Sequence, residues 1–150
     1  MKLPTSLKNA LLTQYGTGCV LMKMPEPCLA LVPQRIWRRE FGRLVRRMQL
    51  ALPGTADTRN FTRLSGSGRI DLELEVQGRI PLPESFRQHA GLKAEGDVAI
   101  IGAENRIEIW SRPHWDQYRR KIEAEYEAIT ERVRGEILGS GAPPAPPSRN

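Results

Sequence analysis

The clearest hydrophobic pattern in the chain is a strict alternation between residues 70 and 76. Apolar side chains hold the even positions and acidic ones the odd positions, in the order Ile70, Asp71, Leu72, Glu73, Leu74, Glu75 and Val76. Successive side chains of a β-strand point to opposite faces, so this pattern predicts a strand over 69–76 with one buried face. Shorter apolar and β-like runs predict further strands at 18–24, 28–32, 60–64, 98–102 and 106–110.

Helical periodicity separates these strands. A short helix is expected from Pro4 to Gly16 and another over 83–92, while longer helices follow Pro33 and Pro113 because proline suits the first helical position. The last helix carries an apolar stripe at three- and four-residue steps, formed by Trp115, Tyr118, Ile122, Tyr126, Ile129, Val133 and Ile137. A stripe of this kind packs on the domain's own core or on a neighbouring subunit, and both alternatives stay open here.

The order of these elements occurs twice. The segment Leu3 to Lys8 reappears as Leu82 to Arg87, and the segment that runs from Leu29 to Trp37 reappears as Ile107 to Trp115, each about 79 residues later. We therefore expect one α+β domain built from two pseudo-symmetric copies of a single unit. The expected boundaries are a first repeat at 1–50, a second repeat at 59–138 and a disordered tail, rich in Pro, Gly and Ser, at 139–150.

Charge is unevenly distributed along the 150 residues. The net charge is +6, and residues 1–50 hold nine Lys or Arg against two Glu. A basic half of this kind favours a polyanionic partner. The sequence has neither an apolar run that could span a bilayer nor a signal peptide, so we expect a cytoplasmic protein.

The sequence holds no recognisable catalytic or metal-binding motif. His89 and His114 lack partners at ligand spacing, and no Ser or Cys stands in a nucleophile motif. The Gly66-Ser67-Gly68 segment precedes a strand, which is the wrong context for a phosphate loop. Cys19 and Cys28 lie in neighbouring strands where they could approach one another, and we expect reduced thiols in the core. No enzyme activity, cofactor, metal or small-molecule substrate is predicted.

Two basic groups are candidates for binding. The first comprises Arg35, Arg38, Arg39, Arg43, Arg46 and Arg47, opposite the apolar face of the helix after Pro33; it either meets phosphates or simply faces solvent. The second is the segment Glu75-Val76-Gln77-Gly78-Arg79. Its acid can orient the guanidinium while the turn pushes Arg79 outward, where two donors match O6 and N7 of guanine. An ordinary hairpin salt bridge is the simpler interpretation.

Several segments in order resemble the second half of the MraZ family, whose chains carry two repeats related to the AbrB/SpoVT DNA-binding domain. They are Glu75 to Pro83, Phe86 to Leu92, Arg106 to Trp110 and Trp115 to Tyr118. The resemblance is strong over 60–120 and weak over 2–48. It implies a core of swapped-hairpin β-barrel repeats, ring assembly, and transcriptional control through tandem direct repeats of double-stranded DNA upstream of division and cell-wall genes.

The family's acid-x-x-x-Arg motif falls on Glu75 and Arg79, so the resemblance places Arg79 at the DNA, oriented by Glu75 where Asp is usual. Gln77, Arg69 and Lys2 complete the predicted DNA-binding set. The matching motif of the first copy would precede Met1, because Met1 stands where Ile80 stands in the second copy. A start codon placed too late, a truncation, or a diverged member without DNA binding would each explain this.

The leading prediction is therefore a nucleoid-associated regulator that binds DNA as a homo-oligomer, with a ring as the expected form. A ring-forming interaction protein that has lost specific DNA readout is the alternative. An antitoxin is disfavoured, because the tail is Pro-rich and nearly uncharged instead of forming a toxin-wrapping segment.

Overall fold

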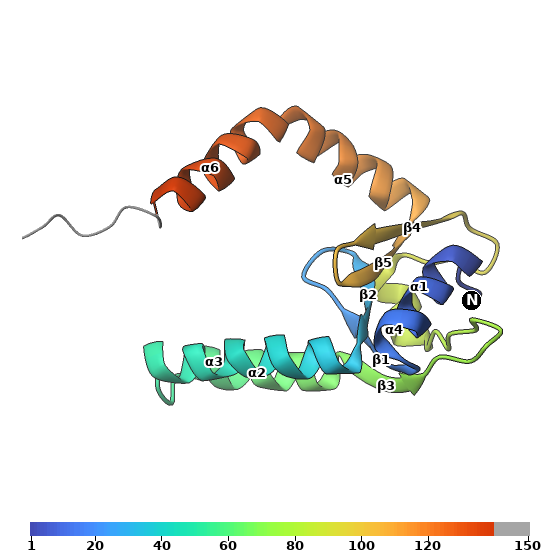
Figure 1. Ribbon diagram of the computed structural model, residues 1–150, viewed down its shortest axis with the longest axis horizontal. Helices are drawn as coiled ribbons and strands as arrows, with labels where there is room; N and C mark the ends of the chain where they lie inside the picture. The colour runs from blue at the N-terminus through green and yellow to red at the C-terminus, as the bar shows by residue number, and fades with distance from the viewer. Residues whose placement is uncertain (140–150) are drawn as a thin grey trace, which may run out of the picture. The chain divides into compact units, whose positions relative to one another are not determined.

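The computed structural model describes residues 1–139, and their five strands form one antiparallel sheet in the order β3-β1-β2-β5-β4 (Figure 1). The strands are β1 (Gly18–Lys23), β2 (Cys28–Pro33), β3 (Arg69–Glu73), β4 (Val98–Ala103) and β5 (Arg106–Ser111). The predicted α+β class is confirmed. Strands β1, β2, β4 and β5 agree with the predicted runs to within one residue at each end.

β3 is shorter than the alternating pattern predicts. Its partner β1 begins at Gly18, which lies opposite Glu73, so the ladder has no further strand residue to pair with. The alternation itself is confirmed, because Ile70 and Leu72 pack against the core while Asp71 and Glu73 are exposed. The pattern therefore predicts the buried face correctly as far as Leu74, whereas Val76, predicted on the same face, is 81% exposed in the turn that follows. The length of the neighbouring strand sets where β3 ends.

The two copies of the repeat share this sheet, and equivalent residues face each other where they meet. Strands β2 and β5 pair so that Ala30 lies opposite Glu108, its counterpart in the second copy. Met1 and Ile80 are also counterparts, and they exchange backbone hydrogen bonds of 2.9 and 3.1 Å. A residue paired with its own counterpart marks a local two-fold axis. The duplication thus builds one joint structure instead of two separate domains.

The main core lies on the face of the sheet covered by the two short helices, α1 (Thr5–Tyr15) and α4 (Glu84–Ala90). These helices are copies of each other, so each repeat contributes one cover. The core side chains are Leu3, Leu11, Cys19, Leu21, Leu29, Leu31, Leu74, Ile80, Phe86, Ala90, Ile107 and Ile109. A smaller cluster of Ala30, Val32 and Ile36 joins the sheet to the next helix, α2 (Gln34–Ala51).

The prediction of a strand at 60–64 is wrong, because this segment belongs to helix α3 (Ala56–Ser67). The Thr55 hydroxyl accepts a hydrogen bond from the Thr58 backbone N–H at 3.3 Å and so caps the helix start. Phe61 then stacks on Phe41 of α2 with ring centroids 6.1 Å apart. Phe and Thr favour strands in isolation, but the cap and this packing outweigh that preference. The loop over 52–55 consequently joins two helices, α2 and α3.

The segment after Ser111 forms two helices, α5 (Arg112–Ala124) and α6 (Tyr126–Gly139), where one long helix was predicted. Residues 1–114 form one compact unit, and a second unit begins at Trp115. Within the described residues, neither α5 nor α6 has a buried side chain. Among the described residues, therefore, no side chain of the apolar stripe is fully buried, and its contact with a neighbouring subunit stays a prediction. The predicted tail lies outside the described residues from position 140 onward.

None of the helices found in residues 1–139 combines the length and the apolar character needed to cross a membrane.

Both cysteines are buried free thiols, as predicted, but the sheet register keeps them apart. Cys19 lies opposite Pro33 at one end of the β1–β2 hairpin, whereas Cys28 begins β2 and pairs with Trp110 of β5. Burial raises the pKa of Cys19 to about 11 and that of Cys28 to about 12, with the carboxylates of Glu73 and Glu108 adding to the respective shifts. Both thiols are therefore protonated at neutral pH.

We expect neither thiol to react with Ellman's reagent at pH 8 in the folded protein, because only the thiolate is nucleophilic. Both should react within minutes in urea, where the pKa returns to about 8.5. The raised pKa contributes stability below the ordinary thiol pKa, and this contribution declines as the pH rises toward 11. Rapid labelling of the folded protein at pH 8 would contradict the burial of these groups.

Candidate nucleic-acid interface

A tight turn follows β3 and carries the predicted motif. The Gly78 N–H donates to the Glu75 carbonyl at 2.8 Å, which closes a four-residue β-turn with Val76 and Gln77 exposed at its tip. Gly78 has φ +70°, and a Cβ at this position would lie 3.0 Å from Lys8 Cδ. Glycine is therefore favoured by the backbone conformation, and any larger residue would have to displace the Lys8 side chain.

The first copy of the repeat braces this turn of the second copy. Lys8 of α1 donates from Nζ to the Val76 carbonyl at 2.7 Å, and the Leu3 N–H donates to the Gly78 carbonyl at 2.9 Å. Leu74 before the turn and Ile80 after it are buried in the core. The backbone at Arg79 is thus anchored on both sides, while the Arg79 side chain is exposed.

Lys2 lies directly opposite Arg79 in an antiparallel bridge. The adjoining Met1 and Ile80 form the hydrogen-bonded pair, so Lys2 and Arg79 form the non-hydrogen-bonded pair, in which Cβ atoms lie about 4.5–5.5 Å apart. Both side chains are exposed. Like charges placed directly opposite each other are destabilising, and an anion bound between them would relieve the repulsion.

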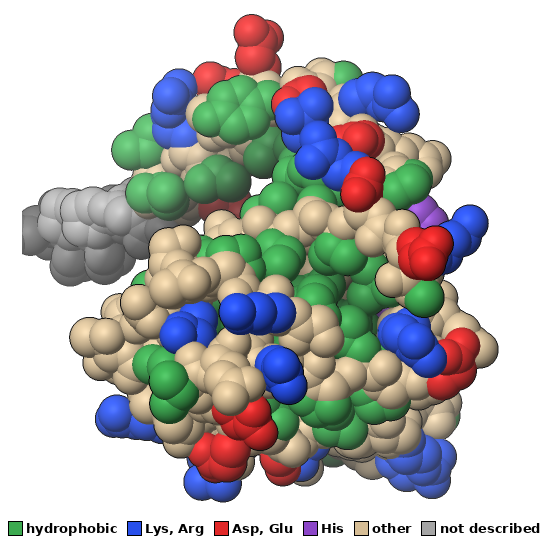
Figure 2. Space-filling view, turned by 90° about the vertical axis from the view of Figure 1, so that its right-hand side faces the viewer, with side chains coloured by type: hydrophobic (Ala, Val, Ile, Leu, Met, Phe, Trp, Pro, Cys, Tyr) green, Lys and Arg blue, Asp and Glu red, His purple; other side chains and the backbone are tan. Residues whose placement is uncertain are grey.

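These two cations line an open pocket of about 850 Å³ together with Met1, Leu72, Glu73, Glu75, Ile80 and Pro81. Figure 2 looks onto the side of the molecule on which the N-terminus lies in Figure 1. Lys and Arg side chains on that side stand among hydrophobic and uncharged ones, with carboxylates nearby. Positive charge on this face is therefore interspersed with other side chains and does not form one continuous patch.

The other predicted residues take different positions. Gln77 is exposed at the tip of the turn, whereas Glu75 contributes its backbone carbonyl to the turn. Across residues 1–139, no ion pair joins the Glu75 carboxylate to Arg79, so the orienting role of Glu75 stays a prediction. Arg69 lies at the opposite end of β3, where its guanidinium carbon is 3.9 Å from the ring centroid of Trp37. The structure thus groups Lys2, Glu75, Gln77 and Arg79, and it places Arg69 elsewhere.

Sequence reasoning missed the bracing role of Lys8. Its counterpart in the second copy is Arg87, so the repeat pattern aligned two basic residues without indicating a contact. The Lys8 contact joins residues 68 positions apart, and no local pattern predicts it.

Comparison with known proteins places the turn in a named family. A family model described as "MraZ protein, putative antitoxin-like" matches residues 67–136, which contain the turn and the whole second repeat from β3 onward. A transcriptional regulator MraZ of Heliobacterium modesticaldum is 39% identical over 132 residues, covering 87% of this chain and 85% of that protein. The chain belongs to the MraZ family. A second such regulator, from Moorella thermoacetica, is 38% identical over 121 residues and 80% of each chain.

This membership confirms the resemblance read from the motif segments. The MraZ relatives are named as transcriptional regulators, which supports the prediction of a DNA-binding regulator over that of an enzyme. A match over 132 residues is longer than the second repeat, so it extends into the first. Residues 1–139 contain no cluster of three or more His, Cys, Asp or Glu side chains that could hold a metal ion.

Proposed function

We propose that this MraZ protein recognises its DNA sites through the turn at Glu75–Gly78 and the adjoining Arg79. The observation that carries the proposal is the pairing of exposed Arg79 with exposed Lys2 on a backbone held by Lys8 and Leu3. A guanidinium offers two donors that match O6 and N7 of guanine, and a backbone fixed in advance lowers the entropic cost of binding. Gln77, at the tip of the same turn, reaches further base edges.

In this proposal a homo-oligomer, arranged as a ring, places several such turns on tandem direct repeats upstream of division and cell-wall genes. Each site binds weakly and the assembly sums them. Two features of the described residues support self-association. The outer edge of β4 pairs with no strand of residues 1–139, and the apolar stripe of α5 and α6 includes exposed Tyr126, Val133 and Ile137. Open strand edges and apolar surfaces are where chains associate.

A second function is favoured by one observation, namely that Glu75 and Arg79 form no ion pair within residues 1–139. An arginine without its orienting carboxylate can lose base readout while the protein still assembles. In that case the chain is an interaction protein of the nucleoid that binds DNA without sequence preference.

Fluorescence anisotropy distinguishes the two functions. We expect the chain to bind a duplex of tandem repeats from upstream of its own gene more tightly than a scrambled duplex of equal length, at both 50 and 200 mM salt. Nonspecific contacts weaken steeply with salt, whereas base contacts preserve the ratio between the two duplexes. Equal affinity for both duplexes at each salt concentration would support the second function and refute the first.

A further inference from the structure

The net positive charge of the chain is concentrated on the helical hairpin of α2 and α3. Helix α2 carries six arginines and one glutamate, and α3 carries two arginines and one aspartate. The hairpin therefore has a net charge of +6, which equals the net charge of all 150 residues. The rest of the chain is electrically balanced, so a polyanion is drawn to this hairpin before any other part of the protein.

Aromatic packing holds the hairpin in one arrangement. Trp37 and Phe41 stack within α2 with ring centroids 4.7 Å apart, and Phe41 stacks in turn on Phe61 of α3. Arg69, the first residue of β3, lies over the Trp37 ring and joins the base of the hairpin to the sheet. These contacts hold α2 in place, so its charged side chains extend from a fixed helix.

Four arginines of α2 form one row. Arg35, Arg39, Arg43 and Arg46 follow at steps of four, four and three residues, which align side chains along one face of a helix. All four are exposed, and the helical period places Trp37 and Phe41, which serve the hairpin's own packing, on a different face. We call this set the α2 arginine row.

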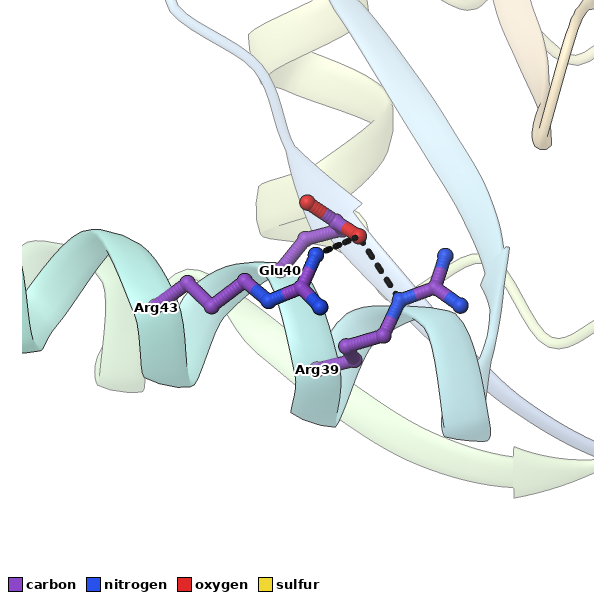
Figure 3. Close-up of polar contacts among 3 residues, drawn as sticks. All are labelled: Arg39, Glu40 and Arg43. Carbon is purple, nitrogen blue, oxygen red and sulfur yellow. Dashed lines mark hydrogen bonds and ion pairs between the residues drawn. The ribbon is translucent and has the colours of Figure 1, made fainter.

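Glu40 is the single carboxylate on α2, and two arginines of the row share it. Its Oε1 atom lies 2.8 Å from Arg39 Nε and 3.6 Å from Arg43 Nη1 (Figure 3). Within the described residues, Arg35 and Arg46 make no ion pair. Like charges three or four residues apart destabilise a helix, so the row costs stability in the isolated chain and gains it when an anion binds.

We propose that the α2 arginine row binds the phosphates of the same duplex whose bases the Arg79 turn contacts. This inference rests on the proposed function, because it assigns a second contact to that complex. The row spans about 16 Å at 1.5 Å per residue, and one DNA strand carries a phosphate about every 3.4 Å along the axis, so the row follows several consecutive phosphates. Guanidinium groups bind phosphate through paired hydrogen bonds.

In the proposed complex the phosphate contacts of the row flank the bases contacted by the turn. β3 runs from the base of the hairpin to the turn, so the two surfaces lie at opposite ends of this strand (Figure 1). A membrane surface fits the row less well. A helix lying on lipid inserts an apolar face beside its charges, whereas Trp37 and Phe41 are engaged in the hairpin.

The test compares two variants of the full chain with equal net charge. The row variant carries Arg35→Gln, Arg39→Gln, Arg43→Gln and Arg46→Gln. The control variant removes four exposed cations elsewhere, through Lys93→Gln, Arg120→Gln, Lys121→Gln and Arg132→Gln. Both have a net charge of +2, and glutamine keeps the helix propensity. Circular dichroism verifies folding, and anisotropy is measured with the repeat and scrambled duplexes between 50 and 200 mM salt.

We expect the row variant to bind both duplexes about tenfold or more weakly than the wild type and to show a salt slope lower by about 0.9 for each lost phosphate contact. The ratio of affinities for the two duplexes should stay equal to that of the wild type. The control variant should differ far less from the wild type in duplex affinity and in salt slope. Equal salt slopes for the two variants would overturn the inference. So would a row variant that keeps its duplex affinity but loses binding to phosphatidylglycerol vesicles.

Failure of the proposed function is recognised separately. It appears as a wild-type chain without preference for the repeats, and the difference in salt slope between row and control variants still decides whether the row contacts phosphate.

Discussion

Replacing Arg79 with alanine should weaken binding to the repeat duplex by about 1–3 kcal/mol for each contacting subunit, which is the cost of losing a bidentate contact with guanine. The effect is expected to be large because Arg79 is exposed on a backbone anchored by Leu74 and Ile80. In the proposed assembly several subunits act together on tandem sites, so the loss in overall affinity should exceed that of a single site. The measurement is an anisotropy titration with the repeat and scrambled duplexes in parallel.

Arg79→Lys is the matched control for this prediction. It keeps the positive charge opposite Lys2 but replaces the planar fork by a point charge. We expect this variant to bind the scrambled duplex like the wild type and to lose most of the preference for the repeats. Unchanged affinity of Arg79→Ala for the repeat duplex would remove Arg79 from the interface, whatever the lysine variant does.

Trp110→Ala should lower the free energy of unfolding by about 3–5 kcal/mol, the usual cost of removing a large buried aromatic side chain. Trp110 is 1% exposed and lies in β5 between Cys28 of β2 and Ala99 of β4. Its indole N–H donates to Glu108 Oε2 at 3.1 Å, so the substitution also removes a hydrogen bond from a largely buried carboxylate. Typical domains are stable by only about 5–15 kcal/mol, which makes this a large fraction of the total.

Urea unfolding followed by circular dichroism measures this effect. Leu50→Ala provides the control, because Leu50 is 85% exposed and its truncation should change stability by less than about 0.5 kcal/mol. Trp110→Phe keeps most of the buried volume but loses the N–H donor and part of the indole ring, so its loss of stability should fall between the two. A loss below about 1 kcal/mol in Trp110→Ala would contradict the burial of this side chain in the joint sheet.

In the proposed complex the two basic surfaces contribute differently to DNA recognition. The Arg79 turn carries few charges on a fixed backbone, which suits base readout. The α2 arginine row carries many charges with a single carboxylate among them, which suits phosphate contacts without sequence information. A regulator that combines them gains affinity from one surface and specificity from the other.

Sequence reasoning predicted the elements whose cause is local. The alternation over 70–76 indicated a half-buried strand, proline and glycine marked the ends of the short helices, and two similar segments about 79 residues apart revealed the duplication. The family motif at Glu75 to Arg79 could also be recognised in the sequence, because its residues are only four positions apart. These features depend on residues that are close in the sequence, so hydrophobic periodicity and turn-forming residues indicate them directly.

Prediction from the sequence was wrong where the local secondary-structure preference and long-range packing disagreed. Asn60 to Leu64 favoured a strand by composition, and stacking of Phe61 on Phe41 together with the Thr55 cap makes it helical. The long C-terminal helix read from a continuous stripe is divided between α5 and α6. In the first case a tertiary contact outweighed residue propensity.

By itself the sequence determined the class of the fold and the family, and it predicted the repeat and the motif. Only the tertiary structure decided that Lys2 lies opposite Arg79, that Lys8 braces the turn, and that Arg69 lies apart from it. The physical reason is that the first two contacts join segments more than 60 residues apart, and the register between such segments follows from the shared core. Helical and strand periods report which face of an element is buried, but they carry no information about which distant residue that element meets.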